Sequence, residues 1–157
     1  METVDLLIIG AGPAGVSTAL HLLQQDASWA KRMLLLEKST HPRPKPCGGG
    51  MTLLGLRVLR DLDFPLPLPI SQAQVNDVRL KYGTRTIHVH GNPQIVIFHR
   101  PELDAYLAEK AQERGVTLCQ NEAVSSFRLE DEGIRVTTTQ GHYFAKAMVA
   151  ADGSKGI

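Results

Sequence analysis

The chain of 157 residues carries a formal net charge of +1, and it contains 43% hydrophobic and 21% charged residues. These values are typical of a soluble globular domain with a sizeable core, and they provide no long-range field to recruit nucleic acid or an anionic membrane. The two cysteines are far apart and do not make a disulfide framework, so we expect a cytoplasmic protein.

The first forty residues predict a strand, a glycine-rich turn, a helix and a second strand. An apolar run at residues 4–9 leads into Gly10-Ala11-Gly12-Pro13-Ala14-Gly15, and a helical pattern follows to about residue 25. A second apolar run at residues 33–36 ends at Glu37. This order and spacing match the βαβ unit that binds dinucleotides.

Each part of this unit has a physical role in binding a dinucleotide. Gly10 permits a sharp turn, Gly12 lets a pyrophosphate approach the backbone, and Gly15 lets the helix pack against the strands. Pro13 suits the first helical turn, whose free N–H groups face the phosphates. Glu37 lies where a carboxylate binds a ribose hydroxyl. The alternative is a βαβ unit with a glycine-rich turn and no ligand.

Proline and glycine dominate the segment that follows Glu37. Prolines at positions 42, 44 and 46 keep the chain extended, and Cys47 then precedes Gly48, Gly49 and Gly50. The N–H groups of these glycines would lack partners if they were buried, and a flat or anionic ligand would satisfy them. The alternative is a mobile surface linker.

The rest of the chain alternates between helical and strand patterns. We predict a helix at 52–62 with Thr52 as its N-cap, an antiparallel meander (75–82, 85–90, 95–98) with turns at Gly83 and 91–93, and a helix from Arg100 to Gly115. We further predict strands at 116–119, 123–129, 134–139, 142–144 and 145–151, the last before Asp152-Gly153-Ser154. Because the chain stops just after this turn, we expect a truncated protein.

Two groups of side chains are candidates for chemistry of their own. Cys47 is a candidate thiolate or acid, but a small apolar side chain at the edge of a ligand is the favoured interpretation. His88 and His90 share one strand face, with His99 nearby, but no carboxylate or thiol completes a zinc or copper set locally. A solvated strand face is therefore favoured, and we predict no metal site.

Several motifs resemble a flavoprotein family that includes geranylgeranyl reductases and the aromatic flavin hydroxylases. Residues 45–50, Lys-Pro-Cys-Gly-Gly-Gly, are similar to the Pro-x-x-Cys-Gly-Gly segment of the reductase branch. Arg100, Leu103-Asp104 and Leu107 resemble the family's Arg-x-x-Phe-Asp-x-x-Leu helix, with Leu103 replacing the usual Phe. Asp152-Gly153 resembles the family's Asp-Gly motif. The resemblance covers the whole chain as the N-terminal portion of such an enzyme.

The resemblance implies a Rossmann-like α/β FAD-binding fold, in three ββα layers, with an inserted antiparallel β meander. The nucleotide-binding core would be residues 1–72 and 99–157, and residues 73–98 would belong to the substrate-binding layer. The resemblance implies that the FAD pyrophosphate contacts Gly10, Gly12, Pro13, Ala14 and Gly15, that the adenosine ribose contacts Glu37, and that Lys38 and Arg43 flank the adenosine and phosphates. The flavin ring would lie near Cys47 and Gly48–Gly50, and Arg100 would reach the phosphate or ribityl portion. The backbone of Ala123 and Val124 would contact the adenine, and Asp152 and Gly153 would close the site.

The implied activity is that of an FAD-dependent oxidoreductase, in which NAD(P)H supplies hydride and C=C bonds of a geranylgeranyl-type isoprenoid are reduced. One alternative is a monooxygenase that hydroxylates an aromatic ring, and another is a nucleotide-binding module without chemistry. The expected partner is a small apolar molecule, not nucleic acid, with a membrane surface approached only through a lipid substrate. Because later family motifs are missing, we expect this chain alone to be inactive.

Overall fold

The computed structural model describes residues 2–154 and 156, which form two compact units. Among the described residues, the first unit comprises 2–43, 104–154 and 156, and the second comprises 44–103. The second unit is therefore an insertion in the sequence of the first. The boundaries predicted at 72/73 and 98/99 both fall inside this insertion, and its assignment to substrate binding stays a prediction. Within the described part of the chain, no helix combines the length and apolar character that a transmembrane span requires.

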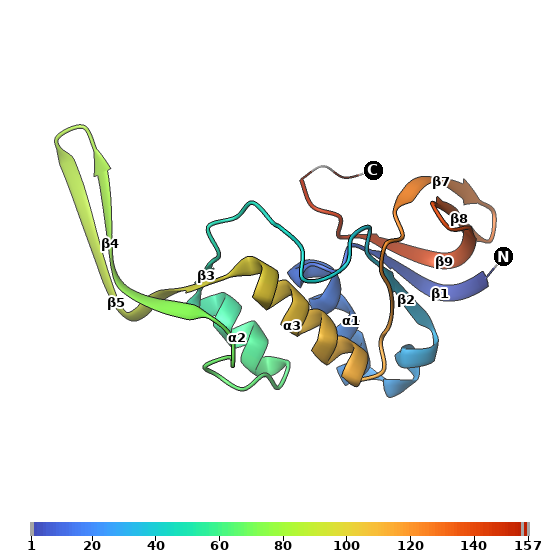
Figure 1. Ribbon diagram of the computed structural model, residues 1–157, viewed down its shortest axis with the longest axis horizontal. Helices are drawn as coiled ribbons and strands as arrows, with labels where there is room; N and C mark the ends of the chain where they lie inside the picture. Colours follow the sequence, from blue (N-terminus) through green and yellow to red (C-terminus); the bar gives the residue numbers. More distant parts are fainter. Residues whose placement is uncertain (1, 155, 157) are drawn as a thin grey trace. The chain divides into compact units, whose positions relative to one another are not determined.

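The first unit is built on a six-stranded sheet with the order β6-β2-β1-β9-β8-β7 (Figure 1). The first four strands in this order are parallel, and β8 and β7 continue the sheet in antiparallel fashion. The strands are β1 (Glu2–Ile9), β2 (Met33–Leu36), β6 (Thr117–Cys119), β7 (Val124–Glu130), β8 (Gly133–Thr138) and β9 (His142–Ala150). A parallel core with an antiparallel edge is the mixed sheet that the fold class predicts.

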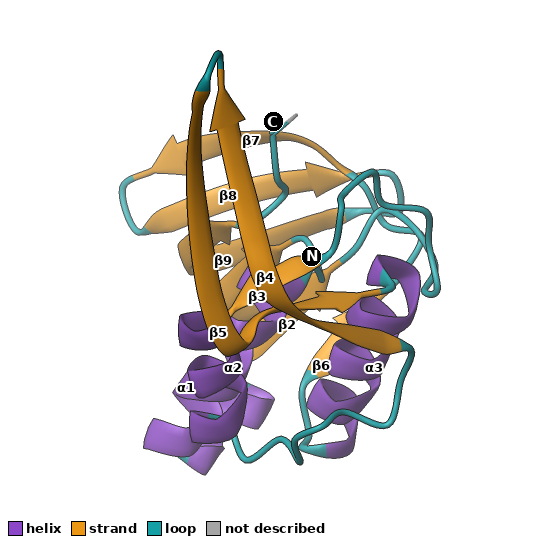
Figure 2. Ribbon diagram, turned by 90° about the vertical axis from the view of Figure 1, so that its left-hand side faces the viewer, coloured by secondary structure: helices purple, strands orange, loops and turns teal. Residues whose placement is uncertain are grey.

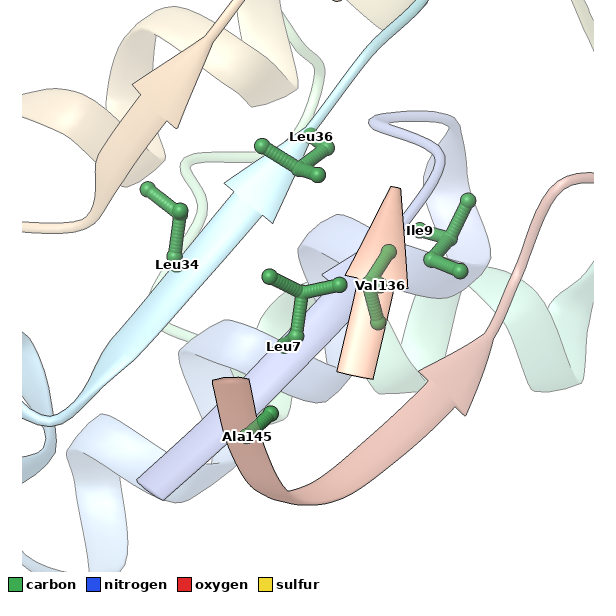
Figure 3. Close-up of a cluster of buried hydrophobic side chains, with 6 residues drawn as sticks. All are labelled: Leu7, Ile9, Leu34, Leu36, Val136 and Ala145. Atoms are coloured by element: carbon green, nitrogen blue, oxygen red, sulfur yellow. The ribbon is translucent and has the colours of Figure 1, made fainter. Parts of the chain in front are cut away.

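The run of buried residues along β1 is explained by cover on both faces of the sheet. Successive side chains of a strand point to opposite faces. Ile8 faces helix α1 (Pro13–Gln25), because a Cβ at Gly15 would lie 3.3 Å from its Cγ2. Leu7 and Ile9 point to the other face, where they pack with Val136 of β8 (Figure 3). The mixed α/β fold predicted from the sequence is therefore confirmed, and its description as three ββα layers stays a prediction.

Two further helical segments, a 3-10 helix and a third α-helix, complete the description of the first unit. A 3-10 helix, η1 (Ala27–Lys31), connects α1 to β2, and its N-cap Asp26 accepts a hydrogen bond from the Ser28 N–H at 2.8 Å. Helix α3 (Arg100–Glu113) begins in the second unit and ends in the first, where Leu107, Ala108 and Ala111 are buried.

The second unit contains a three-stranded antiparallel sheet with the order β3-β5-β4 (Figure 2). Its elements are β3 (Gly50–Thr52), α2 (Leu53–Asp61), β4 (Gln72–Tyr82) and β5 (Arg85–Phe98). The turn predicted at residues 91–93 is wrong, because β5 runs continuously through it. Val75 pairs with Ile95 and Asp77 with His90, so Asn76 alone lies opposite four residues of β5. The turn-forming residues therefore make a bulge in the ladder.

Three further details of the structure differ from the sequence prediction or qualify it. Residues 142–144 and 145–151 are one strand, β9, because its first part pairs with β8 while almost its whole length pairs with β1. Strand β3 was not predicted, since glycine weakens a strand pattern and only three residues are involved. Thr52 is the N-cap residue of α2, but its side chain makes no capping hydrogen bond.

Candidate cofactor site

The glycine corner lies where the carboxyl ends of three parallel strands meet. The Gly10 N–H donates to the Leu36 carbonyl at 2.7 Å, and the Ala151 N–H donates to the Ile9 carbonyl at 2.8 Å. Gly10 has a φ of +98°, and a Cβ there would lie 2.5 Å from the Ala151 carbonyl oxygen. A Cβ at Gly15 would collide with the Gly10 carbonyl. The backbone is therefore packed so closely that only glycine fits at either position.

The first turn of α1 opens from this corner with its N–H groups uncapped by side chains. Gly12 is the N-cap residue, Pro13 is at the start of the helix, and the first turn contains no acidic side chain. The corner lies at the carboxyl end of the sheet, where ligands of open α/β folds bind. A helix N-terminus without an internal anion is suited to bind a phosphate there. The predicted roles of residues 10–15 are compatible with this geometry and stay predictions.

Glu37 is buried and faces the glycine corner. Its side chain is only 3% exposed, and Oε2 accepts a hydrogen bond from the Ala11 N–H at 3.0 Å. Oε1 accepts from the Ser39 N–H at 3.1 Å. The carboxylate therefore lies beside the glycine-rich turn, as a ribose-binding role requires. Its contact with a ribose stays a prediction.

Arg43 connects this carboxylate to helix α3. Its Nη2 lies 3.2 Å from Glu37 Oε2 and 3.8 Å from Asp104 Oδ2. The same Nη2 is 3.6 Å from the position that a Cβ at Gly12 would occupy. Arg43 therefore reaches the glycine corner, whereas Lys38 is an exposed side chain. The Arg43 Nε is buried and has no hydrogen-bond partner, so it leaves one donor for a ligand.

His41 is a member of this cluster that the sequence reasoning missed. Its Nε2 lies 3.1 Å from the Ala11 carbonyl oxygen, which can only accept, so Nε2 carries the proton. The Nδ1 is then an acceptor, and it is buried without a partner. Burial is the main reason that the pKa of His41 is lowered, and the nearby Arg43 lowers it further. The only signal for His41 in the sequence is its position directly before the prolines at 42, 44 and 46.

The loop after β6 holds the backbone of Glu37 on its other side. The Glu37 N–H donates to the Cys119 carbonyl at 2.8 Å, and the Glu122 N–H donates to the Glu37 carbonyl at 3.0 Å. The buried Glu122 side chain accepts from the Thr138 hydroxyl at 2.7 Å. The end of β6 and the loop after it therefore fix the backbone at the end of β2, and Thr138 holds this loop through Glu122.

The residues expected at the adenine and at the closing turn lie in the same unit. Ala123 donates its N–H to the Thr139 hydroxyl at 3.2 Å and accepts the Thr139 N–H at 2.9 Å. Val124 begins β7. Asp152 has its Cα 3.1 Å from the position of a Gly10 Cβ, and Gly153 has a φ of +88°. The closing turn thus abuts the glycine corner, while the Ala123 backbone already bonds to Thr139.

A second group of predicted residues lines an open pocket of about 840 Å³ in the inserted unit. The pocket is formed by residues 44–48, 71–73 and 97–101, so it brings together Cys47, Gly48 and Arg100. Gly49 lies beside it and is buried. The expectation that its N–H lacks a partner is wrong, because this N–H lies 3.5 Å from the Cys47 Sγ. Its carbonyl accepts from the Phe98 N–H at 3.0 Å, and Gly50 begins β3.

The histidines on β5 have a local carboxylate, which corrects the sequence analysis. Asp77 Oδ1 lies 3.4 Å from His88 Nε2 and 2.9 Å from His90 Nδ1. All three side chains are more than half exposed, as expected for a solvated strand face. Across residues 2–154 and 156, no group of three or more His, Cys, Asp or Glu has an arrangement that could hold a metal.

Comparison with known proteins identifies similar sequences and folds. Residues 3–157 match the family described as FAD binding domain. An uncharacterized protein of Methanosarcina barkeri is 30% identical over 159 residues, which cover the whole chain and 39% of that protein. The menaquinone reductase of Mycobacterium tuberculosis is 35% identical over 65 residues, or 39% of this chain and 14% of that protein.

Two solved structures have the same fold as the chain. A geranylgeranyl bacteriochlorophyll reductase-like protein of Thermoplasma acidophilum superposes with a TM-score of 0.76 at 24% identity, over 98% of this chain and 40% of that protein. A probable FAD-dependent monooxygenase of Pseudomonas aeruginosa gives a TM-score of 0.74 at 16% identity, over 99% and 44%. The chain thus spans less than half the length of the relatives that it matches.

Proposed function

Since the chain belongs to the FAD-binding domain family, we propose that it is the dinucleotide-binding part of an oxidoreductase that reduces C=C bonds of an apolar isoprenoid with NAD(P)H. The observation that carries the proposal is the cluster of Glu37, His41 and Arg43 beside an uncapped helix N-terminus. The reduction adds one hydride and one proton across the double bond and converts NAD(P)H to its oxidised form.

The residues at the glycine corner fit FAD. The pyrophosphate needs close backbone approach and donors, which the corner, the free N–H groups of α1 and the unpartnered Arg43 Nε provide. The adenosine ribose carries hydroxyl donors, which suit the Glu37 carboxylate and the unpartnered His41 Nδ1 acceptor. The unpartnered Arg43 Nε donor and the unpartnered His41 Nδ1 acceptor therefore both match one ligand that has phosphates and a ribose.

The chain's own residues bind and orient the cofactor in this proposal. FAD, when bound, supplies the ring that accepts hydride and passes it on. Glu37 holds the ribose, Arg43 neutralises phosphate charge, and His41 stays neutral because burial disfavours its charged form. In the inserted unit, Cys47 and Arg100 line a pocket of their own, with Pro44, Pro46 and Phe98 among its apolar walls.

The choice of substrate is supported by the names of the similar proteins. One is a menaquinone reductase, and another is geranylgeranyl bacteriochlorophyll reductase-like. Electron transfer flavoprotein-ubiquinone oxidoreductases also match, with the Schizosaccharomyces pombe protein 29% identical over 148 residues, or 85% of this chain and 22% of that protein. These names share lipids with polyprenyl chains. We therefore propose a polyprenyl substrate for this protein as well.

The proposal is tested with the full-length protein. It should be isolated with FAD and should consume NAD(P)H in step with saturation of a geranylgeranyl double bond, followed by mass spectrometry as a gain of two hydrogens per bond. Glu37→Ala should lower the affinity for FAD, whereas Glu109→Ala, an exposed carboxylate on α3, should not. A protein that binds no FAD at saturating concentration would contradict the proposal.

A second candidate function is hydroxylation of an aromatic ring by a flavin monooxygenase. It is favoured by the likeness of fold to the Pseudomonas aeruginosa protein. Oxygen uptake separates the two, because a monooxygenase couples oxygen consumption to product and a C=C reductase forms product without oxygen. A module without chemistry would bind FAD but produce neither NAD(P)H consumption nor product.

A further inference from the structure

The distal part of the β4–β5 ribbon has one apolar face that no other helix or strand among residues 2–154 covers. Directly opposite residues of two strands lie on the same face, and Val78 pairs with Val89, as Leu80 does with Ile87. Tyr82 continues this face toward the turn. Leu80 is 57% exposed, Ile87 62% and Tyr82 88%. Within the inserted unit the ribbon extends beyond β3 and α2 (Figures 1 and 2).

The same tip is strongly cationic. Residues 78–90 contain Arg79, Lys81 and Arg85 but no aspartate or glutamate, although the whole chain has a net charge of only +1. Arg85 pairs with Tyr82 on the apolar face, and Arg79 and Lys81 lie on the opposite one. The nearest acidic residue in the sequence is Asp77, which bonds to His88 and His90 at the base of this segment. The tip thus combines exposed aliphatic and aromatic groups with three cations.

This combination selects one kind of partner. Contiguous exposed apolar surface marks an interaction site, and aromatic residues with flanking Lys and Arg are characteristic of the membrane–water interface. A second copy of the chain would bring two clusters of three cations together, which is unfavourable. An apolar protein groove would bury the cations without partners. A surface with anionic headgroups above an apolar layer satisfies both properties.

We propose that residues 79–87 dock on an anionic lipid bilayer. Leu80, Tyr82 and Ile87 enter the boundary between headgroups and acyl chains, while Arg79, Lys81 and Arg85 remain at the phosphates. The long stems of the cations allow this arrangement. The inference goes beyond the proposed function and does not depend on it, because it concerns only the hairpin. It differs from a membrane approached solely through a lipid substrate.

The test is flotation of the full-length protein with vesicles. We expect binding to an equal mixture of phosphatidylcholine and phosphatidylglycerol, and little binding to phosphatidylcholine alone. The triple substitution of Arg79, Lys81 and Arg85 to Gln should weaken binding about 100-fold, at about fivefold for each cation. The triple substitution of Leu80, Tyr82 and Ile87 to Ser should weaken it at least roughly tenfold. Leu129→Ser and Arg57→Gln change exposed residues elsewhere and should leave binding unchanged.

A spectroscopic measurement locates the tip directly. Trp29 is the only tryptophan of the chain, so the Trp29→Phe, Tyr82→Trp protein carries a probe only at the tip. Its emission should shift to the blue on mixed vesicles and be quenched by brominated acyl chains. The phenylalanine keeps a ring beneath Arg32, whose Cζ lies 4.2 Å from the Trp29 ring centroid.

Three results of these experiments would overturn the proposal. These are no vesicle binding, binding that the tip substitutions leave unchanged, and an emission of the Tyr82→Trp probe that is already shifted to the blue before vesicles are added, which would show cover by another part of the protein. A dimer in light scattering that Leu80→Ser dissociates would instead identify a second copy as the partner. None of these results depends on FAD or on turnover.

Discussion

The Arg43 guanidinium lies 3.2 Å from the Glu37 carboxylate through Nη2, while its buried Nε has no partner. One side chain therefore neutralises a buried acid and still presents an unused donor. Such a donor is costly unless a ligand satisfies it. This pair is the part of the site with the most direct consequences for experiment.

Arg43→Gln should weaken FAD binding about 10- to 100-fold, because a hydrogen bond to a charged group contributes about 1.5–3 kcal/mol. It should also lower the free energy of unfolding by about 3 kcal/mol, since Glu37 and Asp104 stay buried without their cation. Quenching of flavin fluorescence and urea unfolding measure the two effects. Arg57→Gln on α2 is the exposed control. Unchanged FAD affinity in Arg43→Gln would remove this residue from the site.

Gly15→Ala should lower the free energy of unfolding by about 1–3 kcal/mol, the usual cost of overpacking. The new methyl group would collide with the Gly10 carbonyl and press on Ile8, so α1 must move away from β1. Gly141→Ala is the matched control, because nothing lies within 4 Å of the added Cβ there. Equal stability of the two variants in urea would show that the corner is looser than described.

Leu7→Ala should reduce the free energy of unfolding by about 2–5 kcal/mol, as is usual for a large-to-small change in a packed core. Leu7 is fully buried and packs with Val136 in the hydrophobic core of the first unit. Leu129→Ala, at a residue that is 74% exposed, should cost far less. Urea unfolding measures the free energy of unfolding of both variants, and the comparison holds if this free energy depends equally steeply on urea concentration in the two.

The protein should lose stability as the pH falls below 6.5, the ordinary pKa of histidine, in part because of His41. Burial lowers the pKa of this side chain in the folded state. Below its ordinary pKa the unfolded chain therefore binds more protons than the native one, and stability rises with pH across this window. His41→Gln keeps a donor for the Ala11 carbonyl but cannot titrate, so its unfolding curve should depend less on pH. An identical pH dependence would assign the effect to other groups.

Cys47 should react with a thiol reagent faster than Cys119. Cys47 is exposed, whereas Cys119 is partly buried and burial raises its pKa, which reduces its thiolate fraction. We expect one fast and one slow thiol per chain, and Cys47→Ser should abolish the fast one. If the fast phase persists in that variant, Cys119 is the accessible thiol.

The sequence predicted the parts of the fold that depend on local pattern. The apolar runs at residues 4–9 and 33–36, the glycines between them and Glu37 specify a βαβ unit because each is needed at a fixed spacing. The bulge opposite Asn76 could not be predicted, since it depends on how β4 aligns with β5. Strand β3 depends in the same way on its partner β5, whose paired residues lie 43 to 47 positions later in the chain.

The candidate site was predictable where a motif marks it and not where contacts are long-range. Glu37 follows from its spacing to Gly15, whereas Thr139 bonds to Ala123 across a hairpin that the sequence leaves unaligned. His41 joins the cluster because Gln120 accepts its backbone N–H at 2.6 Å, 79 residues away. No local pattern encodes such a contact.

The backbone bonds that hold Glu37 have a consequence for synthesis on the ribosome. Its N–H and C=O are bonded to residues 119 and 122, which are translated more than eighty residues after it. The opening βαβ unit therefore emerges long before its acidic residue is anchored. A nascent chain stalled before residue 117 should hold adenosine poorly, although every residue of the glycine motif is already present.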